Sequence, residues 1–256
     1  MKSTKTRKSA VQKVQKKLPL EHLLPKLAAE GNSLAQSALA QFYIAGEGTP
    51  AQRAEAVIWC RKAAEQGEAD AQNAMGAGYA VGDALPQDFT EAVNWFRLAA
   101  EQGHAEGQIG LGLAYLKGDG ILCDETQAVH WWQTAAEGGS SKAQYLLGKL
   151  YGIRGSLCNF TEAARWYRKA ADLGHPRAHY EIALLYQEGS GVTQDSMEAY
   201  ACMKVAATLG CDEGQTIWNG LPSATHLDRF RKKMKPAQIA AAMNLAQIRT
   251  ADFTSK

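Results

Sequence analysis

Apolar residues recur along this chain with the spacing of short amphipathic helices. Within residues 69–104 a first set follows the i, i+3, i+4, i+7, i+8 spacing of one helical face: Ala71, Ala74, Met75, Gly78 and Tyr79. After a glycine-containing loop, a second set has a similar spacing: Ala92, Trp95, Phe96, Ala99 and Ala100. The pattern predicts two short helices whose apolar faces cannot be buried by the pair alone.

The same pattern returns at a nearly constant interval. The tryptophans are 36, 36 and 35 residues apart, at Trp59, Trp95, Trp131 and Trp166. Tyrosines and glycines keep this step at Tyr43, Tyr79, Tyr115, Tyr151 and Tyr186, and at Gly67, Gly103, Gly139, Gly174 and Gly210. A period of this size is typical of a stacked repeat array, in which neighbouring units bury each other's apolar faces.

The second helix of each unit has recognisable ends. Asp88 stands three residues before Glu91, a spacing typical of a capping box, and Asn159 with Glu162 and Asp195 with Glu198 repeat it. Gly103 follows the last apolar position, where glycine favours a left-handed C-cap. The chain is therefore expected to be all-α.

These residues resemble the Sel1-like repeat family, which is related to tetratricopeptide repeats. The resemblance rests on A-x-A-x-x-x-(L/M)-G-x-x-Y-x-x-G-x-G, followed by D-x-x-E-A-x-x-W-x-x-x-A-A-x-x-G, over residues 34–211. It implies a right-handed α-solenoid and a role in holding other proteins together. The five expected units are 34–68, 69–104, 105–140, 141–175 and 176–211.

The ends and the departures from the pattern carry further expectations. Residues 21–33 are expected to form an N-terminal capping half-repeat, and 212–256 a partial repeat with a basic capping helix. The fourth unit is one residue shorter between Tyr151 and Trp166. The fifth has Cys202 where tryptophan is expected, which predicts looser packing there.

Charge is segregated along the chain. Residues 1–20 contain seven Lys or Arg and no acid, whereas residues 21–226 contain 14 basic against 24 acidic residues. We expect residues 1–20 to be a disordered, solubilising tail; the alternative is a tail that binds nucleic acid or anionic lipid. No aromatic is interleaved for base stacking, so nucleic acid is the less favoured partner. No apolar run approaches the length of a membrane span.

Searches for catalytic, cofactor and metal motifs favour none of them. No GxxxxGK[ST] loop is present, and the glycines of residues 107–120 fit close helix packing better than dinucleotide binding. His175 and His179 are four residues apart, but no glutamate completes HExxH and no third ligand is evident. Five cysteines form no CxxC pair and predict free thiols in a reducing cytoplasm. We therefore expect a non-enzymatic protein without cofactor or metal.

Specificity is expected on the first helix of each unit, which lines the concave groove in related tetratricopeptide arrays. In the first three units this geometry selects Ser37, Gln41, Asp70, Asn73, Ala77, Glu106, Ile109 and Leu113. In the last two it selects Lys142, Tyr145, Lys149, Arg177 and Tyr180. The shift to basic and aromatic residues suggests an acidic peptide or a terminal carboxylate as the bound group, although each cation could simply be a solvated helix face.

The expected function is thus an adaptor or scaffold that binds a protein or an extended peptide in the groove. Two alternatives stay open. Some cysteine-rich relatives of the family resemble proteins associated with β-lactam binding and hydrolysis, but their regularly spaced cysteine pairs are absent here. The other is binding of nucleic acid or a membrane surface through the basic tail, which predicts strong salt dependence.

Overall fold

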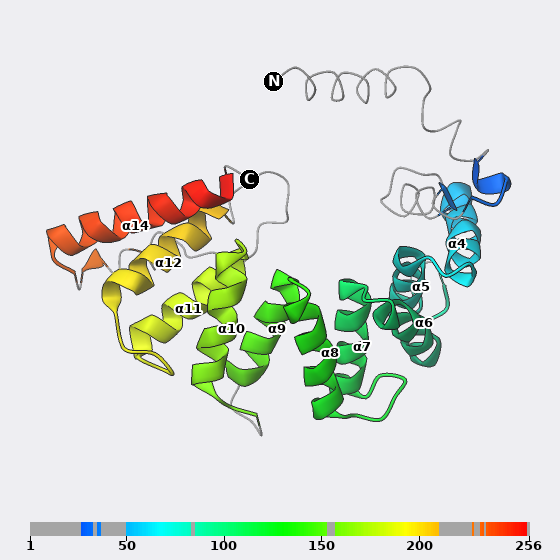
Figure 1. Ribbon diagram of the computed structural model, residues 1–256, viewed down its shortest axis with the longest axis horizontal. Coiled ribbons are helices and arrows are strands. Elements are labelled where there is room, and N and C mark those ends of the chain that lie inside the picture. Colours follow the sequence, from blue (N-terminus) through cyan, green and yellow to red (C-terminus); the bar gives the residue numbers. More distant parts are fainter. Residues whose placement is uncertain are drawn as a thin grey trace, which may run out of the picture. The chain divides into compact units, whose positions relative to one another are not determined.

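The computed structural model describes residues 27–32, 35–36, 50–82, 85–152, 157–209, 227, 231–232 and 234–254. Within these ranges the regular structure is helical and no residue belongs to a strand (Figure 1). The expectations for residues 1–20, for Ser37 and Gln41 of the groove, for residues 153–156 of the loop after Tyr151 and for Cys211 lie outside the described residues. The all-α prediction is confirmed for the part that the structure describes.

The helices divide between two compact units, Met1–Trp131 and Trp132–Lys256, with the boundary inside α8. The first unit contains α4 (Pro50–Glu65), α5 (Ala69–Val81), α6 (Phe89–Glu101), α7 (Ala105–Lys117) and the start of α8 (Glu125–Glu137). The second contains the end of α8, then α9 (Ser141–Gly152), α10 (Phe160–Asp172), α11 (Pro176–Glu188), α12 (Ser196–Leu209) and α14 (Pro236–Thr254).

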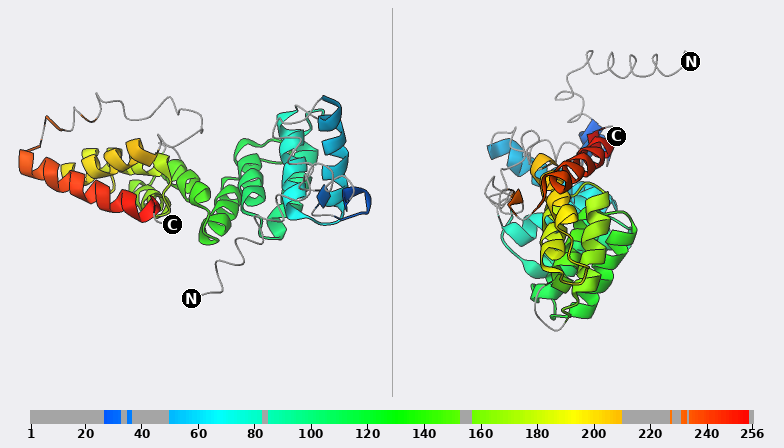
Figure 2. Two further views of the ribbon diagram at one scale, coloured as in Figure 1. Left: turned by 90° about the horizontal axis from the view of Figure 1, so that it is seen from above. Right: turned by 90° about the vertical axis from the view of Figure 1, so that its left-hand side faces the viewer.

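Within each unit, helices that follow one another in sequence pack together. In the first, α5 contacts α4, α6 and α7; in the second, α10 contacts both α9 and α11, and α11 contacts α12. The long helix α14 runs along α12, as two directions of view show (Figures 1 and 2). This agrees with the expected capping helix after the last repeat.

Small residues at the helix contacts explain the close packing. Phe96 packs against Gly76 and Gly110, and a Cβ added at either glycine would lie within 3.0 Å of the Phe96 ring. In the second unit Tyr167 covers Gly148 in the same way. Glycine in the helix interior is therefore used to admit an aromatic ring, at a modest cost in helix propensity.

The structure confirms the predicted N-caps but not the second hydrogen bond of the capping box. The Asp88 carboxylate accepts hydrogen bonds from the backbone N–H groups of Thr90 and Glu91, as an N-cap should. The return bond from Glu91 that completes a capping box is replaced: the Asp88 N–H donates to the Tyr79 carbonyl at 3.0 Å. The same bond joins Asn159 to Tyr151 and Asp195 to Tyr186, so it fastens the loop of each hairpin.

Candidate functional site

A buried glutamine recurs at the same position of successive repeats and is replaced in the last one. Gln36, Gln72, Gln108 and Gln144 each donate from Nε2 to the carbonyl eight residues earlier, at 2.9–3.2 Å. The equivalent residue in the fifth repeat is His179, which is 3% exposed. A glutamine there would reach the Ala171 carbonyl.

His179 is buried without satisfying its ring nitrogens. The Ala171 carbonyl interacts with the ring, but neither Nδ1 nor Nε2 has a hydrogen-bond partner among the described residues. Burial, reinforced by the charge of Arg249, lowers its pKa to about 4, so the ring is neutral near pH 7. A neutral imidazole carries one donor and one acceptor, and with its N–H toward the Ala171 carbonyl the ring keeps an acceptor nitrogen for a ligand.

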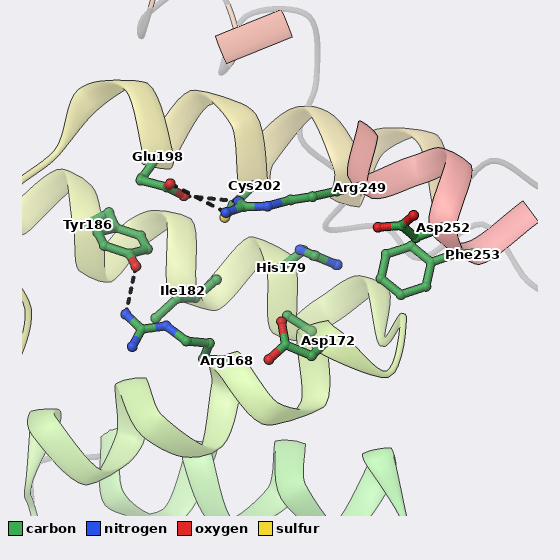
Figure 3. A pocket seen from close by; sticks show the side chains of 11 residues that line it. Arg168, Asp172, His179, Ile182, Tyr186, Glu198, Cys202, Arg249, Asp252 and Phe253 are labelled. Atoms are coloured by element: carbon green, nitrogen blue, oxygen red, sulfur yellow. Dashed lines mark hydrogen bonds and ion pairs between the residues drawn. The ribbon is translucent and has the colours of Figure 1, made fainter. Parts of the chain in front are cut away.

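A pocket of about 440 Å³ opens beside His179 (Figure 3). Its volume falls within the roughly 300–1,000 Å³ typical of ligand sites. The walls come from α10, α11, α12 and α14, all in the second unit. On α11, Ile182 and Tyr186 lie beside His179, and Cys202 faces them from α12.

The pocket exists because Cys202 replaces a tryptophan. Cys202 lies 16 residues after Tyr186, as Trp95 lies 16 residues after Tyr79. In the first unit the Trp95 side chain packs against the buried cluster that contains Met75, as Tyr79 does, and Met75 and Tyr79 correspond to Ile182 and Tyr186. The thiol fills less space than an indole, and the pocket lies beside it, although Cys202 is only 4% exposed because Arg249 covers its sulfur.

The helix α14 closes one side of this hollow with an ion pair. Arg249 donates to both carboxylate oxygens of Glu198, Nη1 to Oε2 at 3.0 Å and Nη2 to Oε1 at 3.3 Å, and its Nη1 lies 3.3 Å from the Cys202 Sγ. Burial nevertheless raises the pKa of the Cys202 thiol to about 11. Since the thiolate is the nucleophile, Cys202 is poorly suited to covalent catalysis near neutral pH.

The opposite wall is held by a contact that recurs in the array. Arg168 donates from Nη2 to the Tyr186 hydroxyl at 2.6 Å, and Arg61 makes the same contact with Tyr79 at 2.7 Å. The Arg–Tyr pair is therefore part of the repeat architecture. The features peculiar to the fifth repeat are His179, Cys202 and the contribution of α14.

Carboxylates and an aromatic ring line the outer part of the pocket. Asp172 on α10 and Asp252 on α14 are exposed, and Phe253 meets the His179 ring edge-on at a centroid distance of 5.9 Å (Figure 3). The rim therefore carries two carboxylates, and the interior combines Ile182, Tyr186 and Phe253 with the polar groups of Arg168, Glu198 and Arg249. This pocket is lined by none of six groove residues predicted from the sequence: Asn73, Lys142, Tyr145, Lys149, Arg177 and Tyr180.

The structure brings several of those groove residues together elsewhere in the second unit. The Tyr145 ring of α9 stacks on the ring of His175, with centroids 4.7 Å apart and planes 16° from parallel. Arg177 makes a side-chain hydrogen bond to Tyr145, and exposed Lys149 interacts electrostatically with Glu181 on α11. Together these residues form a mixed surface on α9 and α11.

The sequence interpretation of this surface missed Glu181. Burial raises the pKa of its carboxyl group, although Lys149 opposes the shift, and Glu181 in turn helps burial to raise the pKa of Tyr145. The cluster is thus less basic than the selection of Lys149 and Arg177 suggested. Glu181 directly follows Tyr180 and lies four residues after Arg177, which was the available signal.

The remaining predicted groove residues lie on α9, α11, α5 and α7. Lys142 is exposed in the first turn of α9, and Tyr180 is half-buried on α11. Asn73 is half-buried on α5 in the first unit. Ile109 was wrongly assigned to an open groove surface, because it is only 6% exposed and belongs to the helix packing.

The histidine pair is explained by helix ends and packing. His175 is the N-cap of α11, and its Nδ1 accepts from the Ala178 N–H at 3.3 Å. His104 caps α7 in the same way, through the Gly107 N–H. Within the described residues no group of three or more His, Cys, Asp or Glu side chains is placed to hold a metal ion.

The other candidate features have structural explanations too. The glycines of residues 107–120 lie in α7 and the turn after it, so the segment packs helices. Cys123 and Cys158 are exposed free thiols, and Cys60 and Cys202 are buried free thiols. In the described part of the chain no helix combines the length and apolar character needed to cross a bilayer.

Comparison with known proteins agrees with this geometry. Among solved structures, a protective antigen of uropathogenic Escherichia coli displaying an SLR fold matches at 32% identity with a TM-score of 0.70. The match covers 90% of this chain and 48% of that protein, so the chain spans about half of it. A Sel1 repeat protein from Oxalobacter formigenes matches at 28% identity with a TM-score of 0.68, over 88% of this chain and 98% of that one.

A third solved structure shows the fold alone. It is a putative Sel1 repeat protein from Klebsiella pneumoniae subsp. pneumoniae, with 23% identity, a TM-score of 0.52 and coverage of 82% and 98% of the two chains. A search of curated protein sequences finds no match. The Sel1 repeat profile matches residues 33–68, 69–104, 105–140, 141–175 and 176–211, and the chain therefore belongs to the Sel1 repeat family.

Proposed function

We propose that this protein is a non-catalytic adaptor that holds a protein partner on the surface formed by α9 and α11. Proteins built from Sel1 repeats are generally scaffolds for protein interaction. For this chain the proposal rests on one observation: a ring stack of Tyr145 on His175 lies beside the cations of Lys149 and Arg177.

The chemistry of that surface favours an extended peptide. Tyr145 and Tyr180 are half-buried and offer aromatic surface at little cost in side-chain entropy. Arg177 and Lys149 can make charge-assisted hydrogen bonds to a carboxylate or to peptide carbonyls. Because the Glu181 carboxylate interacts with Lys149 and Tyr145, we propose a peptide in which acidic and polar residues alternate, rather than a run of acids.

Lys142 extends this surface along α9, and Asn73 offers amide chemistry on α5 of the first unit. An asparagine side chain can donate and accept hydrogen bonds along a peptide backbone. We propose the cytoplasm as the site of action, since the described cysteines are free thiols and fit a reducing compartment.

The test compares partners captured from the native host by three forms of the protein. The first is the wild type, and the second carries Lys142→Glu, Lys149→Glu and Arg177→Glu. The third carries Lys117→Glu, Lys232→Glu and Lys235→Glu, which changes the charge equally at exposed positions outside the surface. Loss of a partner from the second form alone supports the proposal, and equal recovery from all three refutes it.

A further inference from the structure

The vacant tryptophan site of the fifth repeat has the features of a recognition pocket. In the first unit Trp95 and Trp131 fill the equivalent place with side chains of their own chain, each packed against the same buried cluster as Tyr79 or Tyr115. In the fifth repeat the same walls, Tyr186 and Ile182, face a hollow of about 440 Å³ above Cys202. A hollow shaped by neighbours that elsewhere enclose an indole fits an indole best.

His179 marks the hollow as more than loose packing. It is buried on the pocket wall with both ring nitrogens lacking a hydrogen-bond partner, and an unsatisfied buried group is normally costly. In the first unit Gln72 occupies this position and is doubly satisfied, through the Ala64 carbonyl and through Gln102. The fifth repeat keeps the equivalent carbonyl at Ala171, which contacts the His179 ring, but it has lost the second partner, since Leu209 stands at the position of Gln102.

A bound indole would satisfy what the pocket leaves open. Its N–H can donate to an acceptor nitrogen of the neutral His179 ring, and its faces can pack on Tyr186, Phe253 and Ile182. The guanidinium of Arg249, which already pairs with Glu198, can also lie against an aromatic face. At the rim, the exposed carboxylates of Asp172 and Asp252 would face residues that flank the indole in the bound chain.

We propose that this pocket binds a tryptophan side chain of a protein partner, in a segment where lysine or arginine flanks the tryptophan. The proposal rests on the adaptor function proposed above, but it concerns a different surface. The α9–α11 surface holds the peptide through cations and tyrosines, whereas this pocket supplies one aromatic anchor with an acidic rim. Anchors of this kind, buried in a pocket, commonly dominate the affinity of an interface.

The direct test uses the full chain and the peptide Ac-Lys-Trp-Lys-NH2, with binding measured by calorimetry. Cys202→Trp restores the residue of the other repeats and should fill the hollow, reducing affinity by at least about tenfold. Cys202→Ala is the matched control and should bind within about twofold of the wild type. Ac-Lys-Ala-Lys-NH2 should not bind. No binding of the tryptophan peptide to the wild type, or equal binding to Cys202→Trp, overturns the proposal.

A second variant avoids the packing of the core. Asp172→Lys with Asp252→Lys changes two exposed residues and should leave the helical circular dichroism unchanged. The affinity for Ac-Lys-Trp-Lys-NH2 should fall by about tenfold and the affinity for Ac-Glu-Trp-Glu-NH2 should rise, because the substitutions reverse the charge of the rim. If N-acetyltryptophanamide binds as tightly as the basic peptide, the rim plays no part and a basic protein segment is refuted.

These results are separable from the adaptor test. The Lys142, Lys149 and Arg177 triple variant leaves the pocket intact and should bind Ac-Lys-Trp-Lys-NH2 like the wild type. Loss of peptide binding in that variant would place the tryptophan at the α9–α11 surface and overturn the pocket proposal. If the wild type does not bind the tryptophan peptide in the calorimetric test, the prediction that the α9–α11 surface captures a partner still stands.

Discussion

Arg249 of α14 forms a two-pronged ion pair with Glu198 of α12, across 51 residues of sequence. The two side chains are only 33% and 28% exposed, so solvent screens the pair less than a surface bridge. Because α14 packs along α12, this pair fixes the register of the last helix of the second unit. It also forms one wall of the pocket.

Removing the Arg249 charge should loosen α14. Arg249→Met keeps much of the aliphatic stem but leaves the half-buried Glu198 carboxylate without its partner, which should cost about 1–3 kcal/mol of unfolding free energy. Hydrogen exchange of residues 236–254 should accelerate. The control is Arg165→Met, which breaks a more exposed i, i+3 pair with Glu162 and should cost less than about 0.5 kcal/mol. Equal effects of the two substitutions would contradict the prediction.

His179→Gln should stabilise the protein near neutral pH by about 1 kcal/mol. The glutamine can donate to the Ala171 carbonyl, as Gln144 does to Ala136, and it removes the two unsatisfied ring nitrogens. The midpoint of urea denaturation at about pH 7 measures the effect. A lower midpoint than that of the wild type would show that the fifth repeat cannot accommodate the glutamine bond.

Acid should destabilise the wild type more than this variant. Folding lowers the pKa of His179 to about 4, whereas in the unfolded chain a histidine titrates near 6.5. Between these values the unfolded state binds the extra proton, so stability falls as pH decreases through this window. At about pH 5 the loss from His179 is roughly 2 kcal/mol, whereas His175, whose pKa is also lowered to about 4, is present in both proteins and destabilises them alike. The difference in denaturation midpoint between wild type and His179→Gln should therefore widen on acidification.

Gly120 and Gly191 should tolerate no side chain. Each has a positive φ, 73° and 69°, and a Cβ would overlap the backbone of the preceding repeat at Phe89 or Phe160. Gly120→Ala or Gly191→Ala should cost at least about 3 kcal/mol, because backbone atoms cannot move aside. Gly103→Ala is the control, since its φ is 81° but the space is open, and it should cost about 1–2 kcal/mol. Thermal melting followed by circular dichroism distinguishes the two classes.

The cysteines should separate by reactivity. Burial raises the pKa of both Cys60 and Cys202 to about 11, whereas Cys123 and Cys158 are exposed. In a Cys211→Ser background, two thiols should react with a disulfide reagent within minutes at about pH 8, and the other two only on unfolding. Rapid labelling of Cys202 in the folded protein would mean that α14 opens readily.

Much of the architecture could be predicted from the periodic residues. The recurrence of Tyr79 and Trp95 at a fixed distance identified the two-helix unit, and the Asp88 and Asn159 caps were placed correctly. These features depend on local spacing and backbone propensity, which a sequence displays directly. The replacement of the return bond of the capping box could not be foreseen, because the Tyr79 carbonyl that accepts from Asp88 belongs to another helix.

The pocket shows where sequence reasoning stopped. The missing tryptophan at Cys202 was visible, and looser packing followed from it. The sequence did not show that Arg249 and Phe253 line the pocket beside Cys202, since these residues lie about fifty positions further on. In the same way Lys149 and Arg177 were selected by helix position, while Glu181 was recognised as part of their cluster only from its burial.

The sequence by itself determined the repeat, its two helices and the residues that end them, because each depends on neighbours within about one helical turn or on a constant period. Only the tertiary structure decided which side chains share an environment. The pairing of Glu198 with Arg249, the unsatisfied ring of His179 and the acidic rim at Asp172 and Asp252 arise from helices brought together by packing. Burial and electrostatic contact depend on distance in space, and the chain order does not display that distance.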